Sequence, residues 1–245
     1  MTYCVAMRLE EGLIFISDSR TNAGVDHIAT FRKLHRFGVK GERIIVIQSA
    51  GNLATSQAVI TRLRHQIQIN AERHLHNVSS LFEAAELVGE CMTDIVKHVD
   101  SLSDSNEYDF TSSLLLGGQI MGEPPELYSI YPQGNFIAAT IDTPYFQIGE
   151  SKYGKPILDR TLNYNMPLDK ALRCALLSFD STLRSNVSVG TPLDLIVYRS
   201  NQFNMPEGRR VYDTDPYFSL VRRQWADGLR NTMNNLPQPP DDYWR

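Results

Sequence analysis

The segment TYCVAMRLEEGLIFISDSRT, residues 2–21, predicts two strands joined by a turn and so sets the architecture at the start of the chain. Residues 3–7 and 13–17 are rich in the aliphatic, aromatic and β-branched side chains that strands favour, and the segment between them ends in a glycine. We therefore expect a β-hairpin at the start of the chain. Its first strand begins directly after Thr2, and its second strand leads into Asp18.

Outward from this hairpin, the hydrophobic pattern changes from the period of strands to that of helices and back. The first half of the chain predicts two strands, two helices and a polar surface loop, at residues 29–37, 43–48, 60–71, 81–99 and 100–109. Ser79 or Ser80 is a suitable N-cap for the second helix. The second half predicts four strands, two helices, two strands and a last helix, at residues 112–120, 126–130, 135–140, 145–148, about 152 onward, 168–183, 193–198, 211–213 and 216–234.

Runs of strands followed by runs of helices indicate segregated layers, an α+β arrangement, and not alternating βαβ units. Two antiparallel sheets with helix pairs on both outer faces satisfy this order. We find no internal repeat and expect residues 1–245 to form a single domain.

The composition narrows the function classes. The chain has 24 Lys and Arg against 28 Asp and Glu, a net charge of -4, which argues against a nucleic-acid partner. No run of 18 apolar residues predicts a membrane span, and the N-terminus lacks the pattern of a signal peptide. Three cysteines far apart indicate reduced thiols. We therefore expect a cytoplasmic protein without a membrane partner.

Familiar metal and cofactor motifs are missing from the sequence. His74 and His76 lie two apart near a helix end, a spacing that puts them on different faces, and no cysteine is near enough to complete a zinc pattern. Neither a GxGxxG nor a GK[ST] loop is present, and no GxSxG elbow marks a serine nucleophile. The sequence predicts no metal site and no cofactor.

Thr2 offers a different kind of chemistry, because removal of Met1 would give it a free α-amine beside its hydroxyl. An N-terminal amine can activate a threonine hydroxyl, and its reference pKa of about 7.7–8 leaves part of it unprotonated near neutrality. If Met1 stays attached, that amine is an amide and cannot act as a base. Many proteins begin Met-Thr without using the threonine, so Thr2 alone does not establish a nucleophile.

Asp18 and Lys33 add to this pattern. A buried lysine ammonium beside the hydroxyl lowers the pKa of that hydroxyl, and an aspartate can hold the lysine in place. Taken singly, an aspartate in a turn and a solvated lysine are both common. Cys4 falls on the same strand face as Thr2, and we expect it to be a buried thiol and not the nucleophile. His35 is expected to be a packed strand residue.

Together these residues resemble the proteasome β subunits and their bacterial relatives. The likeness rests on Thr2, Asp18-Ser19-Arg20, Lys33 and Ser49-Ala50-Gly51, and continues in LLLGGQ, in the Ile148-Gly149 step and in residues 184–188 (RSNVS) before the strand at 193–198. The sequence as a whole is most similar to the Anbu (ancestral β subunit) family. The resemblance covers about residues 2–200 and implies a four-layer αββα N-terminal-nucleophile hydrolase fold. Residues 201–245 then form a C-terminal helix extension with a Pro-rich tail.

The resemblance also implies roles for single residues. Thr2 would be nucleophile and general base, Lys33 would depress the pKa of its hydroxyl, and Asp18 would orient Lys33. The Gly51 N–H would donate to the oxyanion, and Ser188 would support the amine. The first specificity pocket would be lined by Thr21, Phe31 and Ser49.

Three positions depart from the family pattern. Lys33 is one residue closer to Thr2 than usual, so a turn between Arg20 and Lys33 must be shorter. Ser185 stands where the family has an aspartate. Glu150 stands where a hydroxyl usually follows the glycine, with Ser151 one place further on. The last two changes alter the hydrogen bonds around the amine.

The resulting hypothesis is a self-assembling threonine-type peptidase that acts on peptides or unfolded proteins, as a homo-oligomer in a ring or a helical stack, with any ATPase partner unassigned. One alternative is a non-catalytic scaffold subunit, and another is a small-molecule amidase or acyltransferase with the same nucleophile. The last helix, with Trp225 and Leu229, and the aromatic Tyr243 and Trp244 either dock on a neighbouring subunit or pack on the chain's own core.

Overall fold

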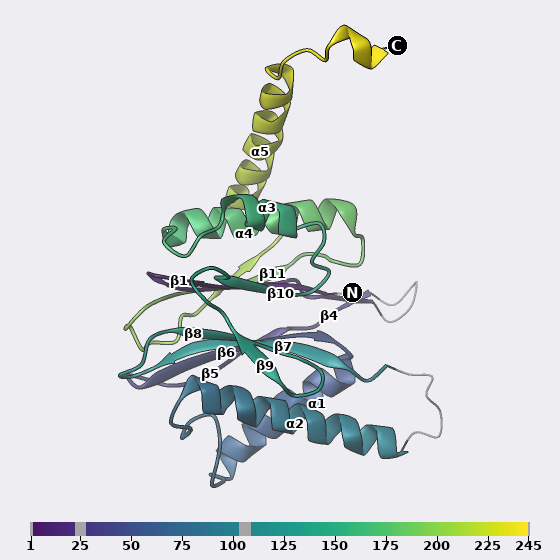
Figure 1. Ribbon diagram of the computed structural model, residues 1–245. Coiled ribbons are helices and arrows are strands. Elements are labelled where there is room, and N and C mark those ends of the chain that lie inside the picture. Colours follow the sequence, from purple (N-terminus) through teal and green to yellow (C-terminus); the bar gives the residue numbers. More distant parts are fainter. Residues whose placement is uncertain (1, 23–27, 103–108, 245) are drawn as a thin grey trace.

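The computed structural model describes residues 2–22, 28–102 and 109–244. Two five-stranded antiparallel sheets lie face to face, and helices cover the outer side of each (Figure 1). The predicted four-layer α+β sandwich is confirmed. A short two-stranded sheet lies apart from the two large ones.

The first sheet has the strand order β10-β1-β2-β11-β12 and carries the N-terminal hairpin. Its strands are β1 (Tyr3–Leu9), β2 (Gly12–Ser17), β10 (Tyr145–Gly149), β11 (Leu193–Arg199) and β12 (Arg209–Val211). Both faces of the hairpin are buried, since Tyr3, Val5 and Met7 pack toward the helices while Cys4 and Ala6 pack between the sheets. This explains why its strands read as continuous apolar runs.

The second sheet has the order β5-β6-β7-β8-β9, and every neighbouring pair is antiparallel. Its strands are β5 (Leu34–Val39), β6 (Arg43–Gly51), β7 (Ser112–Ile120), β8 (Glu126–Ile130) and β9 (Phe136–Ala138). The small sheet pairs β3 (Arg20–Asn22) with β4 (Ile28–Thr30).

The helices form the two outer layers. α1 (Leu53–Gln68) and α2 (Leu81–Leu102) cover the second sheet, while α3 (Lys155–Thr161) and α4 (Leu168–Ser185) cover the first (Figure 1). α5 (Pro216–Asn234) and a short 3-10 helix (Asp241–Trp244) follow at the C-terminus. The apolar faces of the helices pack into two cores, one under each helix layer, and strand side chains fill a third core between the sheets.

Several predicted boundaries were wrong. The strand expected over 29–37 is broken at residues 31–33, because its first part, β4, pairs with β3 and its second part, β5, pairs with β6 in another sheet. The loop expected over 100–109 is helical as far as Leu102, and its residues 103–108 lie outside the described part. α1 spans 53–68 instead of 60–71, since Asn52 caps it by accepting a hydrogen bond from the Thr55 N–H (3.1 Å). Smaller shifts occur at β9, α3 and β12.

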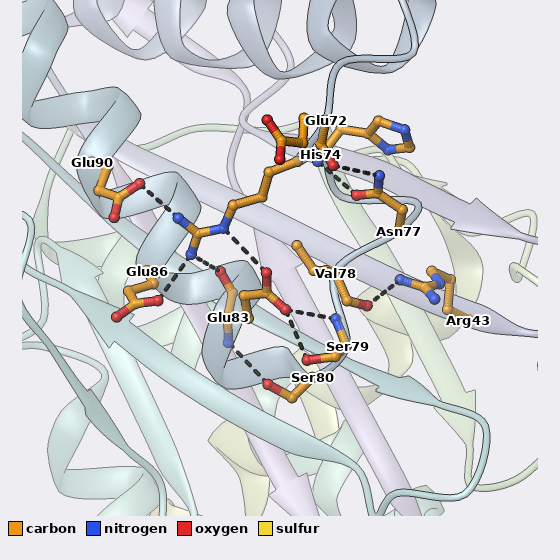
Figure 2. Close-up of polar contacts among 11 residues, drawn as sticks. Arg43, Glu72, His74, Asn77, Val78, Ser79, Ser80, Glu83, Glu86 and Glu90 are labelled. Atoms are coloured by element: carbon orange, nitrogen blue, oxygen red, sulfur yellow. Dashed lines mark hydrogen bonds and ion pairs between the residues drawn. The ribbon is translucent and has the colours of Figure 1, made fainter.

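The connection between α1 and α2 is held by side-chain hydrogen bonds (Figure 2). The Ser80 hydroxyl accepts from the Glu83 N–H (3.1 Å), and the Glu83 carboxylate accepts from the Ser79 N–H (2.7 Å). Ser80 is therefore the N-cap of α2, one of the two predicted candidates. Arg73 donates to three carboxylates of α2, those of Glu83, Glu86 and Glu90.

The C-terminal helix packs on the rest of the chain through its first half, where the half-buried Trp225 lines a pocket with residues of α3 and α4, and then extends away from the four layers (Figure 1). Phe218 is fully buried in the core next to α4, and Arg222 donates to the buried Asp180 carboxylate (2.7 Å). Further along, Leu229 and Trp244 are 52% and 75% exposed. The first turns of α5 thus pack on the chain's own core, whereas its remainder is uncovered. No helix of the described residues has the length and apolar character needed to cross a membrane.

Candidate active site

A pocket of about 460 Å³ opens between the two sheets at the N-terminal end of β1. It is lined by residues that are distant in sequence, namely Thr2, Thr21, Lys33, Ser49, Ala50, Gly51, Leu53, Ser56, Gly149 and Glu150. Thr2 comes just before β1, Gly51 ends β6, and Gly149 ends β10. The fold therefore gathers Thr2 with residues from both sheets.

A buried ion pair lies at this pocket. Lys33 Nζ is 2.7 Å from Asp18 Oδ1, and the two side chains are 5% and 0% exposed. Lys33 also donates to the Arg20 carbonyl (2.6 Å), which fixes the ammonium from a second side. Lys33 lines the pocket, whereas Asp18, its partner in the ion pair, does not.

Asp18 is itself held by the backbone. Its Oδ1 accepts from the Tyr3 N–H (3.0 Å), and its Oδ2 accepts from the Gly190 N–H (3.4 Å). Burial raises the pKa of Asp18, while the Lys33 ammonium and these N–H groups oppose that rise. Asp18 therefore joins the start of β1, the lysine and the segment before β11 in one polar network.

Thr2 is positioned by the strand beside it. In the antiparallel register Tyr3 pairs with Gly149, and the Glu150 N–H donates to the Thr2 carbonyl (2.7 Å). Gly149 has φ +81°, and a Cβ at this position would be 2.0 Å from the Thr2 carbonyl oxygen. Only glycine fits this conformation and this close approach. The glycine in the Ile148-Gly149 step is thus required by the placement of Thr2.

Gly51 ends β6 at the opposite wall of the pocket, with φ +109°. The first turn of α1 begins two residues later, and Leu53 and Ser56 from this turn line the pocket. A helix N-terminus carries unpaired N–H groups and a partial positive charge, which favour an anion nearby. Sequence reasoning named Gly51 but missed the contribution of α1, because it placed the start of the helix too late.

The segment after α4 contacts Glu150. Asn186 is buried, its Nδ2 donates to Glu150 Oε2 (3.0 Å), and its Oδ1 accepts from the Ser188 N–H (2.9 Å). Ser188 is half-buried and Ser185 is exposed at the end of α4, and neither lines the pocket. Sequence reasoning missed Asn186, although it lies directly after Ser185 in the matched motif.

Some of the other expected site residues line the pocket, and others do not. Thr21 and Ser49 line the pocket, and the buried Thr21 hydroxyl has no hydrogen-bond partner among the residues that the structure describes. Phe31 is 37% exposed and does not line the pocket, whereas Lys33 does. Ser151 also lies outside the lining, and its carbonyl accepts from the Lys155 N–H at the start of α3.

Cys4, His35 and His74 carry nucleophilic or basic atoms, but each of them is buried or hydrogen-bonded within the fold. Cys4 is fully buried, its thiol lies 3.6 Å from the Ser49 carbonyl, and burial raises its pKa strongly. Burial, together with Arg64 and Arg32, lowers the pKa of His35 to about 4, so this side chain is neutral near pH 7. The ring of His74 accepts from the His76 N–H and pairs with Asn70. Within 2–22, 28–102 and 109–244, no three acidic, histidine or cysteine side chains gather as metal ligands.

Comparison with known proteins gives the family. The model of the proteasome subunit family matches residues 2–197. A proteasome subunit beta from Methanocaldococcus fervens is 23% identical, with 94% of this chain and 93% of the relative covered. A proteasome subunit alpha from Natronomonas pharaonis is 26% identical over 54% of this chain. The chain spans only 48% of that subunit's length and 64% of a Haloarcula marismortui alpha subunit.

Solved structures are more similar. Anbu (ancestral beta-subunit) from Yersinia bercovieri is 54% identical with a TM-score of 0.92, covering 97% of this chain and 99% of the other. The Anbu complex from Pseudomonas aeruginosa, solved as a helical assembly, is 57% identical with a TM-score of 0.94, covering 98% and 99%. Sequence identity and fold agree along almost the whole length, and the chain therefore belongs to the proteasome subunit family as a β-like protein of the Anbu type, with the proteasome-like N-terminal-nucleophile fold.

Proposed function

We propose that this protein is a threonine-type peptidase that hydrolyses peptide bonds through Thr2 after removal of Met1. The observation that carries the proposal is the buried Lys33–Asp18 pair at the wall of the pocket that Thr2 lines. A buried ion pair contributes little net stability, because desolvation of the two charges offsets their attraction. A catalytic use of the ammonium gives this pair a reason to exist beside a hydroxyl nucleophile.

The chemistry follows from the positions of these groups. The α-amine of Thr2 takes the hydroxyl proton as Oγ1 attacks the substrate carbonyl, and the Lys33 ammonium stabilises the charge on that oxygen. Gly51 and the start of α1 line the pocket, and we assign stabilisation of the oxyanion to the Gly51 N–H; the loss of one such donor typically costs about 10²–10³ in rate. The amine then gives its proton to the leaving amine, and water hydrolyses the threonine ester.

We also propose that the protein assembles with further copies of itself. The 57% identical Pseudomonas relative was solved as a helical assembly, and the uncovered apolar side chains of α5 would be costly in an isolated chain. We therefore expect a homo-oligomer, a ring or a helical stack, in the cytoplasm. Its substrates would be peptides or unfolded proteins that reach a partly enclosed space. No ATPase partner is assigned.

A non-catalytic scaffold subunit is the second candidate. It is favoured by the likeness to archaeal proteasome alpha subunits, which are 24–26% identical. A scaffold would have no use for a free Thr2 or for a buried lysine in the same pocket. The two candidates therefore differ in the state and the reactivity of the N-terminus.

The test begins with the intact mass of the purified protein, which shows whether Met1 has been removed. Hydrolysis of a panel of fluorogenic peptides is then compared for the native chain, Thr2→Ala and Thr2→Ser. We expect loss of one methionine, turnover by the native chain, partial turnover by Thr2→Ser and none by Thr2→Ala. Retained Met1 in protein purified from its native host, or equal turnover by Thr2→Ala, would overturn the proposal.

A further inference from the structure

Glu150 is a carboxylate at the position where it can meet the N-terminus. Tyr3 pairs with Gly149 across the β1–β10 ladder, so Glu150 comes opposite Thr2, and its N–H donates to the Thr2 carbonyl. Thr2 and Glu150 also line the same pocket. The carboxylate therefore belongs to the surroundings of the Thr2 nucleophile.

The Glu150 side chain is fixed in this place. It is 8% exposed, and Asn186 Nδ2 donates to its Oε2 at 3.0 Å. Asn186 is in turn fixed, because its Oδ1 accepts from the Ser188 N–H. A carboxylate with one amide donor keeps free acceptor capacity, since two oxygens offer about four lone-pair directions. A cationic donor can thus still bind to it.

The charges around the Thr2 amine act in opposite directions. Lys33 lines the pocket and disfavours a second cation, whereas Asp18 does not line it and is occupied by Lys33 and by two N–H groups. Arg20 is directed away, because its Nη1 donates to the Val187 carbonyl (2.8 Å). Glu150 is the carboxylate of the pocket lining, and it favours the protonated amine.

We propose that Glu150, held by Asn186, is a positioning residue that binds the ammonium form of the mature Thr2 α-amine and sets the pH at which this amine becomes a base. The inference rests on the proposed function, because it needs a free Thr2. The ion pair orients the amine beside its own hydroxyl at lower pH. Once the amine loses its proton at higher pH, it can accept the hydroxyl proton.

The test measures the amine directly. Residues 2–245 are produced as a fusion whose cleavage leaves Thr2 first, which makes the experiment independent of Met1 removal. Competitive acetylation with limiting acetic anhydride across a pH series, read by mass spectrometry of the N-terminal peptide, gives the midpoint of amine deprotonation. The native chain is compared with Glu150→Gln, Glu150→Asp and the exposed control Glu123→Gln.

We expect Glu150→Gln to lower the midpoint by about one pH unit, because an opposite charge at close range shifts a pKa by about 1–3 units. The midpoint of Glu150→Asp should lie between those of Glu150→Gln and the native chain, and the midpoint of Glu123→Gln should equal that of the native chain. An unchanged midpoint in whichever Glu150 variant folds would overturn the inference. A shifted midpoint in a protein that cleaves no peptide would instead contradict the peptidase proposal and leave the role of Glu150 standing.

Discussion

The two sides of the Thr2 pocket are built differently. On one side, Lys33 is fixed by the Asp18 carboxylate and the Arg20 carbonyl at 2.7 and 2.6 Å, and the ion pair is almost fully buried. On the other side, the Asn186 amide holds the Glu150 carboxylate at 3.0 Å. The first side is a closed electrostatic unit, whereas the second is a looser contact between two chain segments. We infer that the Lys33 side governs whether the site works, and the Glu150 side governs the pH at which it works.

The largest effect is expected from Lys33→Ala, which leaves the buried Asp18 carboxylate without its cation. Removing one partner of a buried pair typically costs about 3–5 kcal/mol. Urea unfolding should show this loss, and peptide turnover should fall by about 10²-fold or more. The double variant Asp18→Asn/Lys33→Met removes both charges and should regain most of the stability but no turnover. Recovery of turnover in the double variant would contradict the role of Lys33.

Gly149→Ala tests how strictly Thr2 is placed. The added Cβ would meet the Thr2 carbonyl oxygen at 2.0 Å in a backbone with φ +81°, so we expect a loss of about 2–4 kcal/mol and a marked drop in turnover. Gly122→Ala is the matched control, since Gly122 has φ +91° but no atom within 4 Å of such a Cβ. It should cost about 1 kcal/mol and leave turnover intact. Equal effects of the two variants would show that backbone conformation alone matters.

Asn186→Ala tests the looser side. Loss of its hydrogen bonds to Glu150 and to the Ser188 N–H should destabilise the protein by about 1–3 kcal/mol. The neighbouring Ser185→Ala, an exposed position, should change the free energy of unfolding by no more than about 0.5 kcal/mol. Denaturant melts of both variants provide the comparison. A larger effect at Ser185 would mean that the serine carries the role its family position implies.

The smallest expected effect is the contribution of His35 to the pH dependence of the protein's stability. His35 in β5 has its pKa lowered to about 4, whereas an unfolded histidine titrates near about 6.5. Between these values the unfolded chain binds the extra proton, so stability falls as pH drops from about 6.5 to about 4. His35→Gln should flatten this dependence by about 1 kcal/mol, with the side chain's partial exposure limiting the effect. Identical pH profiles of melting for both proteins would contradict the lowered pKa.

The layers and most strands could be predicted from the sequence, because both faces of strands such as β1 and β7 are buried and read as apolar runs. The break at residues 31–33 could not, since the two parts of the expected strand, β4 and β5, pair with different strands in separate sheets. The same limit applies to the site. Asn186 and the first turn of α1 contribute through contacts between distant segments, which no local pattern contains, whereas Thr2, Lys33 and Gly51 stood out through a recognisable spacing.

The exposed part of α5 shows a second limit of prediction from the sequence. Its apolar positions follow helical spacing whether they pack on the same chain or on a neighbour, so the sequence left both alternatives open. The structure shows that Phe218 is buried while Leu229 is largely exposed. The pattern thus predicts the helix but not what covers it.

The most direct measurement is the reaction of the purified protein with a peptide α′,β′-epoxyketone, whose two electrophilic carbons can bond to the hydroxyl and the amine of one N-terminal threonine. Mass spectrometry of the N-terminal peptide locates the adduct. We expect a stable adduct on Thr2 in the native chain, a slower one in Lys33→Met, and none in Thr2→Ala. A protein whose mass shows a free Thr2 but which forms no adduct there would contradict Thr2 as the nucleophile.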